Sequence, residues 1–152
     1  MEIVAEMEAP CDVEALFSWV DDLDRYPQWL EIVTRSQRLS EPGPEPAWAV
    51  ELRGRVGPLA RSKRLRMVRT RHEPGQIARF ERAELDGRNH SSWLLEAAVA
   101  PIDEASAHLT MTLRYDGGLF APVLEKILGD EIERSRHRLI ELVAAAQDRA
   151  DG

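Results

Sequence analysis

The sequence has little of what stabilises small secreted proteins or anchors membrane proteins. Cys11 is its one cysteine, so no disulfide can form within the chain. No run of about 18 apolar residues occurs, which predicts that nothing spans a membrane. The first residues lack the basic start and apolar run of a signal peptide. These absences predict a cytoplasmic protein without stable membrane insertion.

Motifs for metal, phosphate or nucleophilic chemistry are missing as well. The histidines are scattered along the chain and no cysteine cluster accompanies them, so we expect no metal site. No phosphate-binding glycine-rich loop, G-x-S-x-G motif or zinc-protease motif occurs, and we expect no cofactor. The one compact polar group, at 89–92, follows a predicted hairpin and is interpreted as turn chemistry. No catalytic residue can therefore be assigned from a motif.

The composition is that of an ordinary globular protein. With 152 residues, of which 43% are hydrophobic and 31% charged, the chain is long enough for one core, and we expect a single domain over 1–152. The formal net charge of -7 argues against nucleic-acid binding.

The charge is unevenly distributed. From Arg53 to Arg88 there are 11 Lys and Arg against 4 Asp and Glu, whereas the rest of the chain has 9 basic and 23 acidic residues. The basic segment is either a patch for an anionic partner or the solvent face of a sheet. We favour the solvent face, because long charged side chains commonly cover apolar strand surface.

Alternating apolar and polar residues predict seven strands joined mostly by hairpin-length turns. The alternation is clear where Trp93, Leu95, Ala97 and Val99 occupy every second position. The expected strands cover residues 2–8, 31–39, 48–53, 61–71, 77–84, 92–100 and 109–115.

Three helices are predicted around these strands. Asp12 is expected to cap a short helix with an apolar stripe, and Asp24 a second short helix through Leu30. From Pro122 onward, apolar residues recur at spacings of three and four over about 25 residues. Only this helix is long enough to cover an antiparallel sheet, so we predict an α+β fold with a curved sheet wrapped around it.

Two stretches and the final helix carry a family resemblance. They are the segment 9–17 (Ala-Pro-Cys-Asp-Val-Glu-Ala-Leu-Phe) and the segment 22–29 (Asp-Leu-Asp-Arg-Tyr-Pro-Gln-Trp). With this order of elements, the chain resembles the START/Bet v 1-like (SRPBCC) superfamily with its helix-grip fold, and most of all its polyketide cyclase/dehydrase and coenzyme-Q-binding branch. The resemblance implies a deep cavity between sheet and helix. Members bind lipids, sterols, quinones or polyketides, and some are aromatase/cyclases.

Strand parity gives candidate ligand-binding residues on the concave face. Each could line a cavity or only pack in a core, and parity does not separate the two. Large aromatic side chains suit a cavity wall because they combine area with one polar group. The candidates are Trp48, Leu65, Met67, Trp93, Met111, Leu113 and Tyr115.

Arg69 is the candidate with the most specific chemistry. It shares strand parity with Leu65 and Met67, and an inward guanidinium could hold a carbonyl, enolate or carboxylate of a ligand. The resemblance adds that aromatase/cyclases have a basic residue on this strand that positions substrate carbonyls. The alternative is that Arg69 pairs with Glu81 or Glu84 on the neighbouring strand.

Tyr26 and Trp29 lie in the segment that flanks the pocket mouth in the superfamily. They could control ligand entry or fasten the short helix to the sheet, and we favour the second interpretation.

Three functions agree with these observations. The first is binding or transport of an apolar small molecule, such as a lipid, quinone or polyketide. The second is a polyketide aromatase/cyclase or dehydratase, in which Arg69 would stabilise enolate charge. The third is a protein-interaction module that uses the basic strands, against which the net negative charge counts.

Overall fold

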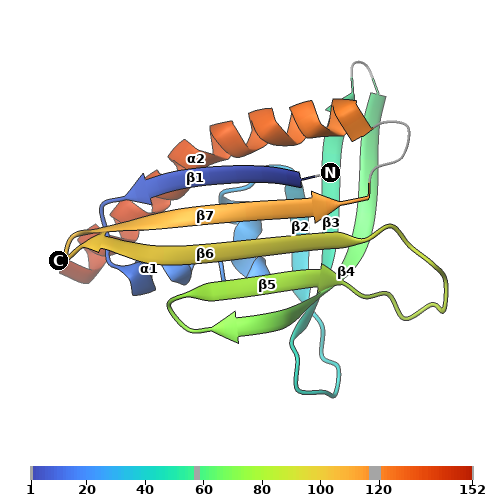
Figure 1. The fold of residues 1–152 in the computed structure, drawn as a ribbon, viewed down its shortest axis with the longest axis horizontal. Helices are drawn as coiled ribbons and strands as arrows, with labels where there is room; N and C mark the ends of the chain where they lie inside the picture. The colour runs from blue at the N-terminus through green and yellow to red at the C-terminus, as the bar shows by residue number, and fades with distance from the viewer. Residues whose placement is uncertain (1, 57–58, 117–120, 152) are drawn as a thin grey trace.

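The structure is a computed structural model that describes residues 2–56, 59–116 and 121–151. Seven strands form one antiparallel sheet in the order β1-β7-β6-β5-β4-β3-β2 (Figure 1). The strands are β1 (Glu2–Ala9), β2 (Val33–Arg38), β3 (Ala47–Val56), β4 (Leu59–Glu73), β5 (Ile77–Arg82), β6 (Trp93–Asp103) and β7 (Ser106–Tyr115). Two short helices, α1 (Val13–Phe17) and the 3-10 helix η1 (Leu23–Gln28), follow β1, and the long α2 (Ala121–Asp151) ends the chain.

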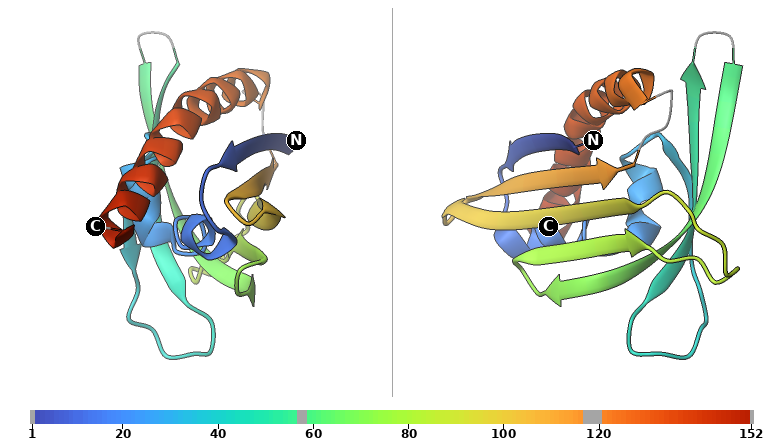
Figure 2. Two further views of the ribbon diagram at one scale, coloured as in Figure 1. Left: turned by 90° about the vertical axis from the view of Figure 1, so that its left-hand side faces the viewer. Right: turned by 45° about the vertical axis from the view of Figure 1, so that its right-hand side comes forward.

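The sheet curls around α2, which confirms the predicted helix-grip α+β fold. In Figure 2, α2 runs across the open side of the sheet, and β3 and the first part of β4 stand steeply against β5 to β7. The end of β4 bends to run beside β5. The helix contacts β1, β3 and α1, with Ser135, Leu139 and Val143 buried on its inner side. It has 31 residues and is therefore longer than predicted, because it continues beyond the apolar stripe to Asp151.

Aspartate side chains determine where the two short helices begin. Asp12 caps α1 as predicted, since its Oδ1 accepts a hydrogen bond from the amide of Ala15 at 2.7 Å. The prediction that Asp24 caps the second helix is wrong: Asp22 is the cap, and its Oδ1 accepts from the amide of Asp24 at 2.9 Å. Asp22 has the extended backbone that a cap requires, whereas Asp24 already lies within the helix.

An aromatic cluster fills the space between η1 and the sheet. Phe80 of β5 lies edge-on to Trp48 of β3 at 5.6 Å and to Tyr26 of η1 at 6.3 Å, measured between ring centroids. Tyr26, Trp48 and Phe80 are completely buried. This cluster fixes η1 against the concave face, and Tyr26 extends it to Trp29, with ring centroids 4.9 Å apart.

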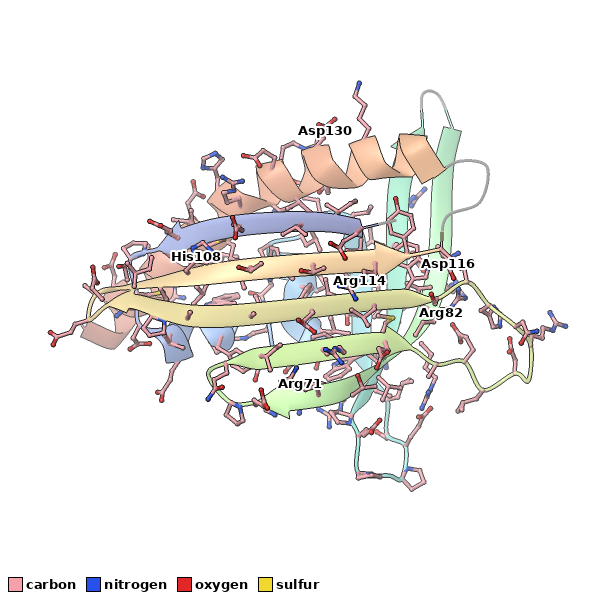
Figure 3. All side chains as sticks on the ribbon, in the orientation of Figure 1. Arg71, Arg82, His108, Arg114, Asp116 and Asp130 are labelled. Carbon is pink, nitrogen blue, oxygen red and sulfur yellow. The ribbon has the colours of Figure 1, made fainter. Side chains whose placement is uncertain are left out.

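The convex face of the sheet is polar. His108 and Arg114 of β7 lie on this face (Figure 3) and contact Glu6 and Glu2 of β1 at 3.5 and 2.5 Å. On the basic strands, Arg64 pairs with Glu51 at 3.5 Å. These pairs favour the interpretation of the basic segment as the solvent face of the sheet. No helix in the described residues is long and apolar enough to cross a membrane.

Candidate functional site

An apolar cavity of about 100 Å³ lies between the concave face of the sheet, η1 and α2. Every described residue of its wall except Glu131 is apolar or aromatic. The wall consists of Ile3, Leu23, Tyr26, Trp29, Leu30, Ile32, Val33, Val50, Leu52, Leu65, Met67, Trp93, Leu95, Met111, Leu113, Glu131 and Ile132.

Strand register brings the sheet side of this wall together. Val50 lies opposite Leu65, and Leu95 lies opposite Leu113, so their side chains share one face. Because side chains alternate along a strand, the intervening residues point outward, as Arg114 does. The apolar wall thus follows directly from the period of two in the sequence.

Five of the predicted ligand-binding residues line the cavity, as do both residues predicted at its mouth. Leu65 and Met67 come from β4, Trp93 from β6, and Met111 and Leu113 from β7. Their position places them in reach of a ligand, and their role in binding one stays a prediction.

Trp48 and Tyr115 share the concave face but are not among the described residues that line the cavity. Trp48 packs against Phe80 in the aromatic cluster. Tyr115 stacks on Trp93 with ring centroids 5.1 Å apart. Other side chains bury both residues. Strand parity predicts the face on which a side chain lies, but it does not predict which neighbours cover that side chain.

Arg69 also lies outside the described cavity wall. Its hydrogen-bond partner is a main-chain atom of the protein itself. Its Nη1 donates to the carbonyl oxygen of Asp21 at 2.9 Å, and its guanidinium lies 5.9 Å from the Trp48 ring. Burial lowers the pKa of Arg69, while nearby Asp21 opposes this shift. The suggested pairing with Glu81 or Glu84 is not what the structure has; Glu84 accepts hydrogen bonds from the Arg66 amide and from Arg82.

Tyr26 and Trp29 are held by hydrogen bonds at their polar ends. The Tyr26 hydroxyl donates to the carbonyl oxygen of Val20 at 2.8 Å, and Trp29 Nε1 donates to that of Trp19 at 3.2 Å. Burial raises the pKa of Tyr26 far above its ordinary value, with a further contribution from Asp21. These bonds favour the interpretation that both residues fasten η1 in place.

Glu131 of α2 is the charged residue of the described cavity wall, and the sequence patterns did not identify it. They also did not assign Leu23, Leu30, Ile32 and Val33 to the wall. Only 6% of the Glu131 surface is exposed, and its Oε2 accepts a hydrogen bond from Arg134 Nη2 at 2.5 Å. Its spacing of four and eight residues from Ser135 and Leu139 was the available signal, because that spacing places it on the inner side of the helix. No group of three or more residues arranged to hold a metal ion occurs in the part of the chain that the structure describes.

A curved sheet closed over one long helix, with an apolar cavity between them, defines a helix-grip protein of the START type. Within that class, the chain belongs to the family described as polyketide cyclase / dehydrase and lipid transport, whose sequence profile matches residues 1–144. The resemblance seen in the sequence is thereby confirmed. No curated protein matches the sequence.

Solved structures share the fold at low sequence identity. A protein from Thermus thermophilus superposes with a TM-score of 0.74 at 20% identity, over 96% of this chain and 99% of that one. A START superfamily protein from Mycobacterium smegmatis gives 0.73 at 16%, over 95% and 98%. The Zhui aromatase/cyclase from Streptomyces sp. R1128 gives 0.63 at 11%, over 100% and 96%. At these identities the likeness establishes the fold alone.

Proposed function

We propose that the protein binds and carries an apolar small molecule, such as a lipid, quinone or polyketide, in the cavity between the sheet and α2. The observation that carries this proposal is the apolar wall, to which six strands of the curled sheet, η1 and α2 contribute. Burial of apolar ligand surface against such a wall is the main driving force for binding. The family to which the chain belongs supports the same function.

The size of the cavity adds a requirement. Its volume of about 100 Å³ is below the roughly 300–1,000 Å³ of typical ligand pockets. A drug-sized ligand therefore requires the wall to move. Met67 and Met111 are the wall residues most suited to this, because methionine has three rotatable bonds and repacks readily.

Native mass spectrometry of the purified protein, followed by solvent extraction, tests the proposal directly. The expected result is a reproducible additional mass that is removed by extraction and identified as a mainly apolar compound. A clean mass of the protein alone, together with no saturable binding of lipids, quinones or polyketides added afterwards, would contradict the proposal.

A matched pair of variants locates the binding. Met111→Trp places a large ring into the cavity, whereas Thr112→Trp places the same ring on the opposite face of β7. We expect Met111→Trp to lose the bound compound and Thr112→Trp to retain it. Equal retention by both folded variants would place the ligand elsewhere.

Glu131 favours one second candidate, a polyketide aromatase/cyclase or dehydratase. A carboxylate on the wall of an apolar cavity could remove a proton next to a ketone, which starts an intramolecular condensation. Incubation with a poly-β-ketone, followed by mass spectrometry, tests this. A cyclised or dehydrated product that Glu131→Gln no longer forms would support catalysis, and unchanged substrate would leave binding as the function.

A further inference from the structure

Two buried polar atoms on residues of the cavity wall have no hydrogen-bond partner among the residues that the structure describes. They are Oε1 of Glu131 and Nε1 of Trp93. Other buried polar atoms of the described residues also lack a partner, but Glu131 and Trp93 alone among those residues line this cavity. An unpartnered buried polar atom is costly, so such an atom on a residue of the cavity wall is a candidate contact for a ligand that displaces part of the wall.

Glu131 is a residue of the cavity wall with one acceptor that has no partner among the described residues, and that acceptor is buried behind the wall surface. Its Oε2 is engaged by Arg134, which leaves Oε1 buried without a donor. Arg134 itself is mostly exposed. One carboxylate oxygen of Glu131 therefore lies toward this surface ion pair, and the other is buried in the protein interior. A carboxylate oxygen accepts hydrogen bonds and cannot donate them while ionised, so the matching ligand group must carry a proton.

Trp93 offers one free donor. Its ring is fixed by stacking on Tyr115, and the Lys63 ammonium lies 5.7 Å from the ring centroid. Trp29 provides the comparison, because it lines the same cavity and its Nε1 donates to a carbonyl oxygen. The indole N–H of Trp93 is buried behind the wall surface, so an acceptor on a ligand reaches it with the same movement of the wall that a larger ligand requires. An indole nitrogen only donates, so the matching ligand group must be an acceptor.

Glu131 also marks the boundary between the cavity and a polar groove. The groove, of about 430 Å³, is lined by Glu31, Ile32, Arg53, Gly54, Asp130, Glu131 and Arg134. Ile32 and Glu131 belong to both walls. Asp130, the residue before Glu131, projects from the outer side of α2 (Figure 3). A ligand with an apolar body and a polar end would fit with that end at Glu131.

We propose that the cavity selects a hydroxylated apolar molecule, whose hydroxyl donates to Glu131 Oε1 and in which an oxygen accepts from Trp93 Nε1. This rests on the proposed function, because it assumes that the ligand occupies this cavity. It goes further by excluding a pure hydrocarbon as the preferred ligand, since a hydrocarbon would leave both polar atoms unpaired. A hydrogen bond to a charged group predicts a preference on the order of tenfold in Kd.

Three small probes of similar shape separate the contributions. Phenol can donate and accept, anisole can only accept, and toluene can do neither. Titration followed by NMR should give the tightest binding for phenol, with toluene weaker on the order of tenfold and anisole between them. Saturable binding of phenol and toluene with equal Kd would overturn the inference and leave the proposed apolar site standing. Absence of saturable binding by all three would overturn both.

Variants then assign the preference to its atoms. Glu131→Leu should bind phenol and toluene equally, whereas the control Glu133→Leu should keep the wild-type preference. Glu133 is a matched control because it forms the same type of ion pair, with Arg136 three residues on, but its side chain is 62% exposed. If Glu131 serves the fold alone, Glu131→Leu will lower the melting temperature and leave the ratio of the two affinities unchanged.

Two conservative variants cover a failure of Glu131→Leu to fold. Glu131→Gln has an amide that donates to an ether oxygen, so anisole should gain affinity relative to phenol. Trp93→Phe keeps an aromatic ring against Tyr115 but removes the N–H, so anisole should lose its advantage over toluene. Unchanged probe ratios in both variants would overturn the inference.

Discussion

Arg69 of β4 donates a hydrogen bond to the main-chain carbonyl of Asp21, 48 positions earlier in the sequence. Three residues further along β4, His72 contacts the Asp21 carboxylate at 3.2 Å and stacks on Phe17 of α1. Both contacts join the segment between α1 and η1 to the sheet. Arg69 therefore stabilises the segment that positions η1, and residues of η1 line the cavity. Arg69 itself is not among the described residues of the wall.

We expect Arg69→Ala to lower the free energy of unfolding by about 1–3 kcal/mol, because a charge-assisted hydrogen bond to a part-buried carbonyl is lost. Apolar ligands should bind the folded variant as they bind the wild type. Urea denaturation and ligand titration measure the two effects. Arg64→Ala is the control, since its ion pair with Glu51 is exposed and should change stability by about 0.5 kcal/mol or less. A loss of affinity without loss of stability would instead place Arg69 on the ligand.

Tyr26 should make the protein sensitive to alkaline pH. Its folded-state pKa lies above the unfolded value of about 10, so its contribution is complete below pH 10 and is lost as the unfolded chain ionises. Near pH 8, Tyr26→Phe should cost about 1–2 kcal/mol, because the Val20 carbonyl loses its donor. At pH 11 the difference from the wild type should shrink by about 1.4 kcal/mol. A difference that stays constant in urea denaturation at both pH values would show that Tyr26 ionises equally in the folded state.

Tryptophan fluorescence should report the cavity selectively. Trp29 and Trp93 line it, whereas Trp48 is packed against Phe80 and is not part of the described wall. An apolar ligand should therefore change the emission of the wild type and of Trp48→Phe to a similar extent, and that of Trp93→Phe less, since Trp29 then remains to report. Equal changes in the two variants would indicate that Trp93 does not face the ligand.

Cys11 should react slowly with thiol reagents. The residue is 1% exposed, and burial raises the pKa of its thiol, helped by the nearby Asp12 carboxylate. Both effects reduce the accessible thiolate that such reagents require. Labelling with a disulfide reagent at pH 8 should be slow in buffer and fast in denaturant. Rapid labelling of the folded protein would mean that the α1 region opens readily.

The fold could be predicted because its signals are local and repeated. Alternation placed Leu65, Met67, Met111 and Leu113 on one face, and a single long amphipathic helix was available to cover it. The polar residues of the site could not be predicted in the same way. Arg69 has the inward parity expected of it, yet the segment between α1 and η1 covers that end of β4. Such coverage depends on the path of the chain between distant elements.

Glu131 was missed for a different reason. A glutamate on a helix is normally assigned to the solvent side, because burial of an unpaired carboxylate is costly. Its spacing from Ser135 and Leu139 gave the correct side of α2. Glu131 breaks the composition rule for buried positions and obeys the geometric one, so the spacing was the better guide to its place.

The strand order determines when the strands can pair as the chain is synthesised. Glu2 of β1 pairs with Arg114 of β7, at a separation of 112 residues, and no other strand of the described sheet borders β1. During synthesis from the N-terminus, β1 must wait unpaired until β7 is made, and α2 follows later still. Contacts this distant in sequence form slowly, because a long loop must close first. The cavity is therefore the last part of the molecule to form, and any molecule that binds in it at that stage could speed the final closure of the sheet around the helix.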